Sequence, residues 1–181
     1  MKVGIIGLGF VGLSLAVFLS SKNVQVTGID TDKTKIQTIQ KGITPFYEPN
    51  LQQYLEKAIK NGLKLKTEIP SDVFSNDLIF ITVSTPINKH DEIDLEHVKS
   101  VVTSLNKKLH FAKKTPTIII KSTVIPGTTI ETIKPLLEGN SFRESRDFNL
   151  LTNPEFLREG SAIKDTRNPH VVIVGGNNVK S

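Results

Sequence analysis

Cysteine and tryptophan are both absent from this 181-residue sequence, and methionine occurs once. Without cysteine the chain can form no disulfide, no thiolate metal site and no cysteine nucleophile. The four histidines are scattered along the chain without the spacing that metal ligands need, so we predict no metal site. These histidines are His90, His97, His110 and His170.

Long hydrophobic runs are also missing, because no stretch approaches the roughly 18 apolar residues that a membrane span requires. Three glycines interrupt the N-terminal apolar run, which continues into a helical pattern without a cleavage site for a secretory signal. Aromatic residues make up only 6% of the chain, and its net charge of +5 comes from lysines spread along its length. Nucleic-acid binders more often carry a basic run interleaved with aromatics. We therefore expect a cytoplasmic protein that binds neither membrane nor nucleic acid.

What the sequence does contain is an alternation of short β-branched runs with longer helical patterns. This alternation predicts one Rossmann-type α/β domain, doubly wound, with a mostly parallel sheet and helices on both faces. We expect strands at residues 2–6, 24–29, 63–66, 78–83, 117–121, 148–151 and 170–174. Helices are expected at about 10–21, 32–41, 50–60, 94–109 and 126–137, with a loop or helix at 153–163.

Several single residues mark the expected ends of these elements. Asn50 and Asp94 are expected to cap their helices, and Pro126 to occupy a first helical position. The pair Gly175–Gly176 should break the last strand. Because the sequence stops soon after these glycines, we expect residues 1–181 to be one domain of a longer enzyme.

The segment Gly7–Gly12 fits the pattern G-x-G-x-x-G directly after the first strand and at the opening of a helix. This context gives the pattern its meaning, since isolated glycines also punctuate ordinary turns. Gly7 would permit the tight turn, Gly9 would let a pyrophosphate approach the backbone, and Gly12 would let the helix pack close to the strand. The free N–H groups of the helix would then bind the phosphates.

Asp30 ends the second predicted strand, about twenty residues after the glycines, where an acid binds the adenosine ribose hydroxyls. A carboxylate there would repel a 2′-phosphate, so NAD is favoured over NADP. The alternative is a purely structural turn followed by a helix-capping aspartate. With strand, glycines and acid all in register, we favour the cofactor interpretation.

Three later segments lie after strands at the carboxyl edge of the predicted sheet, where open α/β folds place their ligands. They are Val83–Pro86, Ile120–Gly127 and Asn153–Ala162. Thr85 and Thr123 offer hydroxyls beside the expected cofactor cleft, although threonines at such places more commonly cap helices or form turns.

Glu155 and Glu159 are four residues apart, so a helical turn would place both on one face. The alternative is a solvated helix face on which Arg158 forms a surface ion pair. Spacing alone does not decide between a functional pair and a solvated face.

Taken together, these segments resemble the UDP-glucose/GDP-mannose dehydrogenase family over essentially the whole chain, up to the end of that family's NAD-binding domain. The matching features are Gly9–Leu13, Asp30 with Lys35, Thr85-Pro86, Asp91–Asp94, Lys121–Thr123 and Pro154–Gly160.

The resemblance implies an NAD-dependent, four-electron oxidation of the C6 alcohol of a nucleotide sugar to a carboxylate, with two NAD and one water. Thr123 and Glu159 would hold the catalytic water near the nicotinamide, and Glu155 would act in acid/base steps during thioester hydrolysis. The implied cofactor-binding residues are Gly7, Gly9, Phe10, Val11, Gly12, Asp30, Lys35, Thr85, Thr123 and Glu159. The implied sugar-binding wall is Glu155, Phe156, Leu157, Arg158 and Glu159.

The sequence departs from the family in lacking its nucleophile, a cysteine that lies beyond the end of this chain together with a lysine–asparagine pair. The central helical domain and the C-terminal uridine-binding domain are missing as well. Because no thiohemiacetal or thioester can form without cysteine, we expect the chain alone to be inactive. Family enzymes commonly dimerise through the central helix, so we expect a homodimer for the full-length enzyme and a monomer for this chain.

The nucleotide sugar stays open at this point. The run from Phe156 to Glu159 favours UDP-glucose as substrate, while GDP-mannose and UDP-N-acetylmannosamine are alternatives within the same architecture. A non-catalytic NAD-binding module, such as a redox sensor, would explain the missing cysteine differently. That interpretation gives no role to Thr123, Glu155 and Glu159.

Overall fold

A seven-stranded sheet forms the centre of the protein in the computed structural model, which describes residues 1–139 and 141–177. The strand order is β3-β2-β1-β4-β5-β6-β7, with the first six strands parallel and β7 antiparallel to β6. The strands are β1 (Lys2–Ile6), β2 (Gln25–Ile29), β3 (Lys64–Lys66), β4 (Leu78–Ile81), β5 (Thr117–Ile120), β6 (Asn149–Thr152) and β7 (Gly175–Gly176).

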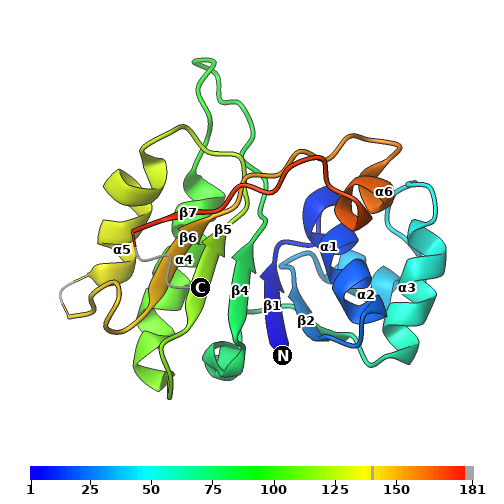
Figure 1. The fold of residues 1–181 in the computed structure, drawn as a ribbon, viewed down its shortest axis with the longest axis horizontal. Helices are drawn as coiled ribbons and strands as arrows, with labels where there is room; N and C mark the ends of the chain where they lie inside the picture. The colour runs from blue at the N-terminus through cyan, green and yellow to red at the C-terminus, as the bar shows by residue number, and fades with distance from the viewer. Residues whose placement is uncertain (140, 178–181) are drawn as a thin grey trace.

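Helices cover both faces of this sheet, as the doubly wound prediction requires (Figure 1). One layer holds α1 (Phe10–Ser21), α2 (Lys33–Gln40), α3 (Leu51–Lys60) and α6 (Ala162–Arg167). The other layer holds α4 (Glu96–Lys108) and α5 (Lys134–Glu138), and α5 continues from a π-helical turn, η3 (Thr129–Ile133). Two short 3₁₀ helices, η1 (Ser71–Ser75) and η2 (Leu109–Phe111), complete the second layer.

The hydrophobic core has two parts, one on each face of the sheet. Alternate side chains of a strand point to opposite faces, so strands buried on both sides need continuous apolar sequence. The runs Leu78–Ile81 and Thr117–Ile120 supply it in the centre of the sheet. In α4, three apolar residues spaced along one helical face, Val98, Val102 and Leu105, are completely buried against these strands. The sheet is thereby enclosed by apolar side chains on both faces.

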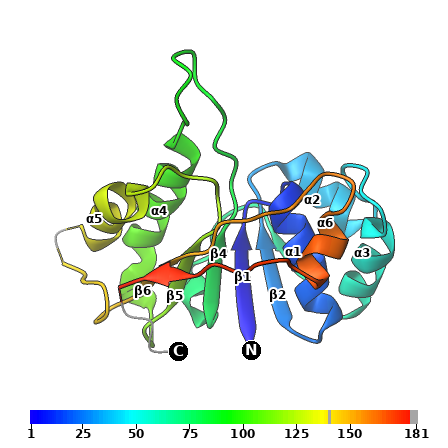
Figure 2. The same cartoon turned by 45° about the horizontal axis from the view of Figure 1, so that its top comes forward.

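The prediction of a last strand at residues 170–174 is wrong. Residues 171–174 run in an extended path from α6 across to the far edge of the sheet (Figure 2), and the pairing with β6 begins only at Gly175. Gly175–Gly176, which we expected to end a strand, are therefore the strand itself. The β-branched pattern of Val171–Val174 misled the prediction, because these residues have no strand beside them and stay 47–65% exposed.

Three helix starts also differ from expectation. Pro126 precedes its helix, because Gly127 has a φ of +92° and the helical backbone begins only at η3. Asn50 occupies the N-cap position of α3 in a left-handed conformation, but its side chain makes no cap hydrogen bond. Asp94 accepts a hydrogen bond from the Glu96 N–H at 2.8 Å, one residue before the N-cap position of α4.

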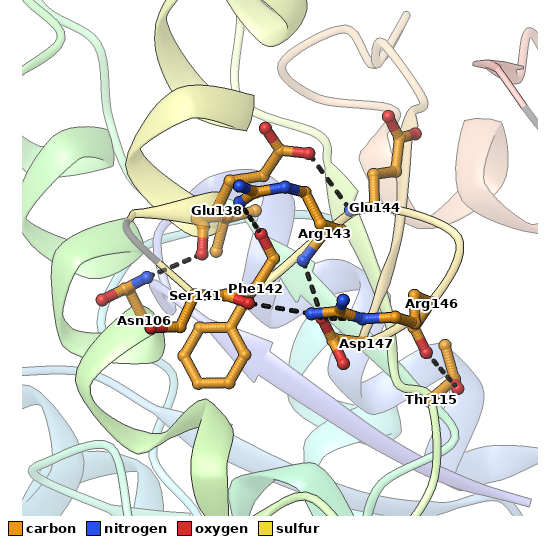
Figure 3. A network of polar contacts seen from close by, with 10 residues as sticks. Asn106, Thr115, Glu138, Ser141, Phe142, Arg143, Glu144, Arg146 and Asp147 are labelled. Atoms are coloured by element: carbon orange, nitrogen blue, oxygen red, sulfur yellow. Dashed lines mark hydrogen bonds and ion pairs between the residues drawn. The ribbon is translucent and has the colours of Figure 1, made fainter.

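A compact polar network holds the chain between α5 and β6, where Figure 3 shows the side chains folded back on the loop. The Asp147 carboxylate accepts hydrogen bonds from the Arg143 N–H at 2.7 Å and from the Arg146 guanidinium at 2.7 and 2.9 Å. The Arg146 guanidinium, followed by the Arg143 N–H, lowers the pKa of Asp147. This network lies away from the carboxyl ends of β1 and β4. Within the described residues, no helix is long and apolar enough to span a membrane.

Candidate functional site

The turn between β1 and α1 is built on three glycines with different structural demands. Gly7 has a φ of +98°, and a Cβ added to it would lie 2.7 Å from the Val83 nitrogen. A Cβ on Gly12 would lie 1.8 Å from the Gly7 oxygen, so only glycine allows the helix to pack here. Gly9 differs from both, because its φ is negative and an added Cβ would meet no protein atom within 4 Å. The open space in front of Gly9 is thus available to a ligand.

The first turn of α1 faces this open space with backbone N–H groups. Gly9 is its N-cap residue and has no side chain to accept their hydrogen bonds, and no acidic residue lies in the first turn. The first N–H groups of a helix lack partners within the helix and carry a partial positive charge. The arrangement therefore suits a phosphate group.

Asp30 lies beside the glycine turn and joins it to the start of α2. Its Oδ2 accepts hydrogen bonds from the Leu8 N–H and from the Lys35 ammonium, both at 2.8 Å, and its Oδ1 accepts one from the Asp32 N–H at 2.9 Å. Burial favours the neutral acid, but the Lys35 ammonium and the two N–H groups outweigh burial and lower the pKa of Asp30. The carboxylate is therefore charged at neutral pH.

The alternative role considered for Asp30, that of a helix cap, is filled by the nearby Asp32. Asp32 is the N-cap residue of α2 and accepts a hydrogen bond from the Lys35 N–H at 2.9 Å. Asp30 instead binds the turn at Leu8. This division leaves the Asp30 carboxylate at the mouth of the turn, in the position where a ribose-binding acid belongs.

A cleft of about 790 Å³ opens at the carboxyl ends of the strands, and the glycine turn forms part of its wall. It lies at the point where the strand order reverses between β1 and β4, which is where doubly wound sheets bind their ligands. Nine of the residues expected at the site line this cleft: Gly7, Gly9, Phe10, Val11, Asp30, Lys35, Thr85, Thr123 and Glu155.

Helix α4 supplies a further wall that sequence reasoning missed. His97, Ser100, Ser104 and Lys108 line the cleft along one side of this helix. The imidazole Nδ1 of His97 lies 3.2 Å from the Ser84 hydroxyl at the end of β4. The available signal was the spacing of these polar residues at three and four positions, but the same spacing marks any solvated helix face.

The loops that follow β4 and β5 are joined to each other in the cleft. The Thr85 hydroxyl donates a hydrogen bond to the Thr123 carbonyl oxygen at 2.8 Å, and the Ser122 hydroxyl donates one to the Val83 carbonyl oxygen at 2.6 Å. The two threonines expected at the site are therefore neighbours. They lie far apart in the sequence but come together because β4 and β5 are adjacent parallel strands.

Lys121 also lines the cleft and was not assigned to the site, although its motif was recognised. Its ammonium donates a hydrogen bond to the Asn153 side-chain oxygen at 3.0 Å. Burial lowers the pKa of Lys121, and the negative charge of Glu155 opposes this effect. A cation and a carboxylate thus share the end of the cleft that lies at β5 and β6.

The segment from Asn153 to Ser161 is a loop, which is one of the two alternatives left open by the sequence, so the helical turn that would place Glu155 and Glu159 on one face does not form. Glu155 is half-buried in the cleft, where its Oε2 accepts a hydrogen bond from the Leu157 N–H at 2.6 Å. Glu159 is exposed in the following turn and does not line the cleft. The left-handed Gly160, with a φ of +82°, prevents a helix from running continuously through this segment into α6.

Arg158 is bound by an acid that we did not single out. The guanidinium donates hydrogen bonds to the two carboxylate oxygens of Asp165 at 3.1 and 2.9 Å, and the Ser161 hydroxyl donates another at 2.8 Å. Arg158, followed by Ser161, holds the pKa of Asp165 well below its usual range. Of the expected sugar-binding wall, Phe156 is 52% exposed, and Phe156, Leu157 and Arg158 lie outside the cleft lining.

Comparison with known proteins decides the family. The NAD binding domain of the UDP-glucose/GDP-mannose dehydrogenase family matches residues 1–181. The chain belongs to this family. As an NAD-binding domain it uses the cofactor that the glycine turn and Asp30 indicated, and the open cradle at Gly9 fits the cofactor's pyrophosphate.

Two members of the family are similar in sequence to almost the whole of this chain. GDP-mannose 6-dehydrogenase from Pseudomonas syringae pv. syringae is 37% identical over 97% of this chain, and UDP-glucose 6-dehydrogenase from Rickettsia prowazekii is 40% identical over 100% of it. The chain covers 40% of the length of each relative.

Solved structures of the family have the same fold. A ternary complex of GDP-mannose dehydrogenase from Pseudomonas aeruginosa superimposes with a TM-score of 0.93 at 36% identity, covering 97% of this chain and 41% of that one. UDP-glucose dehydrogenase from the archaeon Pyrobaculum islandicum gives 0.88 at 28% identity, covering 98% and 41%.

Proposed function

We propose that this chain is the cofactor-binding part of a nucleotide-sugar 6-dehydrogenase, which oxidises the C6 alcohol of its substrate to a carboxylate. The observation that carries the proposal is the placement of Glu155 in the same cleft as the glycine turn and Asp30. NAD, when bound, would supply the hydride acceptor for the alcohol carbon. A carboxylate in the cleft can take up the proton that the alcohol loses in the same step.

We assign three catalytic residues within this reaction. Thr123 and Glu155 already line the cleft, where Thr123 would help to position the hydrolytic water and Glu155 would act as acid and base. Glu159 would assist in holding the water, which requires its exposed turn to move toward the cleft when ligands bind. The wall from Glu155 to Glu159 would contact the sugar.

UDP-glucose is the substrate that we favour, and GDP-mannose is the alternative. The UDP-glucose 6-dehydrogenase from Rickettsia prowazekii supports the first at 40% identity over the full chain. The relative from Pseudomonas syringae and the TM-score of 0.93 to GDP-mannose dehydrogenase support the second. We expect this chain alone, mixed with either nucleotide sugar and NAD, to give no sustained NADH production, because it has no cysteine. Steady turnover would contradict that expectation.

Calorimetric titration with NAD, NADH and NADPH tests the cofactor part of the proposal. The wild-type chain should bind NADH more tightly than NADPH, because the Asp30 carboxylate repels a 2′-phosphate. Asp30→Ala removes a charged hydrogen-bonding group worth about 1.5–3 kcal/mol, so NADH affinity should fall by roughly 10- to 100-fold. Asp72→Ala, which removes a charge from an exposed residue of η1, is the matched control and should bind like wild type. Tighter binding of NADPH than of NADH would overturn the assignment.

A further inference from the structure

Glu48 is a buried carboxylate in the loop between α2 and α3, with only 5% of its surface exposed. Its partners are more than a hundred residues away in the sequence. Oε2 accepts a hydrogen bond from the Gly160 N–H at 2.8 Å, and Oε1 accepts one from the Ala162 N–H at 2.7 Å. Each carboxylate oxygen therefore holds one backbone group at the end of the Asn153–Ser161 loop.

A buried carboxylate is costly unless strong hydrogen bonds compensate for the water it has lost. Among the described residues, the compensation comes from these two backbone donors, which lie at the end of the loop and at the first residue of α6. Ser161, the N-cap residue of α6, makes no cap hydrogen bond and gives its hydroxyl to Asp165 instead. Glu48 thus replaces a local cap with an anchor from another part of the chain.

The loop that contains Glu48 also touches the cofactor-binding turn. The ring of Phe46, two residues earlier, packs against the ring of Phe10 with 5.9 Å between their centroids. Phe10 is the first residue of α1 and lines the cleft. The short segment from Phe46 to Glu48 therefore contacts both the glycine turn and the loop that carries Glu155.

We infer that Glu48 is a positioning residue, which fixes the Asn153–Ser161 loop relative to the glycine turn and thereby keeps Glu155 in the cleft. The importance of Glu155 rests on the proposed function, whereas the positioning itself is a property of the fold. The hydrogen bond from the Leu157 N–H to Glu155 provides a local reporter, because it closes the part of the loop nearest the cleft.

The test compares wild type, Glu48→Gln and the control Glu56→Gln by amide hydrogen exchange measured residue by residue with NMR. Glutamine has the same shape, but its NH₂ group faces one of the two N–H donors, so at least one anchor is lost. Glu56 is exposed on α3, and its substitution removes the same charge. We expect exchange at Gly160, Ala162 and Leu157 to quicken at least tenfold in Glu48→Gln only, while β1 and β4 keep their protection.

A second readout follows the Glu155 contact itself. In wild type the Leu157 amide chemical shift reports its hydrogen bond to Glu155, and in Glu48→Gln it should move toward the value of an unstructured chain. Glu48→Asp, which keeps the charge, should give intermediate results and serves if Glu48→Gln does not fold. Faster exchange at Gly160 and Ala162 with an unchanged Leu157 would overturn the inference, because Glu48 would then only cap α6. Equal loss of protection throughout the chain would overturn it too. Titration of the same wild-type sample with NADH tests the proposed function separately.

Discussion

Two segments border the same cleft and are held in place by different means. The β1–α1 turn obtains its shape from its own glycines, from the end of the adjacent strand β4, and from Asp30, which follows the other adjacent strand, β2. The Asn153–Ser161 loop has no regular structure and is held by side chains from elsewhere, chiefly Glu48 and Asp165. The turn is therefore specified by backbone sterics, and the loop by a few buried charges.

The largest effect should come from adding a methyl group to the turn. In Gly12→Ala the new Cβ would lie 1.8 Å from the Gly7 oxygen, and a backbone atom cannot move aside cheaply. We expect the free energy of unfolding to fall by about 3 kcal/mol, at the upper end of overpacking costs. In the loop, Gly160→Ala meets no atom within 4 Å and should cost only about 1 kcal/mol of backbone strain. Urea denaturation measures both, and equal destabilisation would remove the contrast between the two segments.

A smaller and local effect is expected from Asp165→Asn, which removes the charge that holds Arg158. Amide exchange should quicken from residue 155 to residue 167, while NADH affinity stays unchanged because the turn is built separately. Asp147→Asn is the matched control, since it breaks another Arg–Asp pair, between α5 and β6 (Figure 3). Faster exchange in the glycine turn would show that the two segments are not independent.

The pH dependence of the contact between Asp165 and Arg158 follows from the lowered pKa of Asp165. A carboxylate with a lowered folded-state pKa stabilises the fold fully above its unfolded pKa of about 3.9 and loses this effect as pH falls through the folded value. Protection of the wild-type loop should therefore persist down to about pH 4 and decline only in stronger acid. Asp165→Asn should lack this acid-dependent decline.

The smallest effect concerns the ion pair at the turn. Lys35→Met removes the ammonium that helps to lower the pKa of Asp30, so the difference between its folded and unfolded pKa shrinks and less stability should be lost in acid than in wild type. At pH 7 the cost should be about 0.5 kcal/mol, because Lys35 is partly exposed. Urea denaturation between pH 3 and 7 measures both, with Lys33→Met as the control on the same helix. If the free energy of unfolding fell in acid to the same extent in Lys35→Met and Lys33→Met, the assigned role of Lys35 would be contradicted.

The turn could be predicted from the sequence because its rules are local. A strand, three glycines and an acid at the end of the next strand are all read in order along the chain. The structure confirms the doubly wound sheet and brings Gly9 and Asp30 to the same cleft.

The other parts of the site and fold depend on contacts between residues far apart in the sequence, which local sequence patterns do not reveal. Glu48 reads as an ordinary loop acid until the fold brings Gly160 to it, and the polar face of α4 resembles any solvated helix surface. The β-branched run Val171–Val174 has strand propensity but lies where no neighbouring strand accepts it, so tertiary context overrides propensity.

The most direct test of the cofactor site is calorimetric titration of wild type and Gly9→Ala with NADH, together with their urea denaturation curves. An added Cβ at Gly9 meets no protein atom within 4 Å, so the two chains should have nearly the same stability. The methyl group would occupy the space in which the pyrophosphate approaches the backbone, so NADH affinity should fall at least about tenfold. Wild-type affinity in a stably folded Gly9→Ala chain would contradict the account, because the glycine turn would then not be where the cofactor binds.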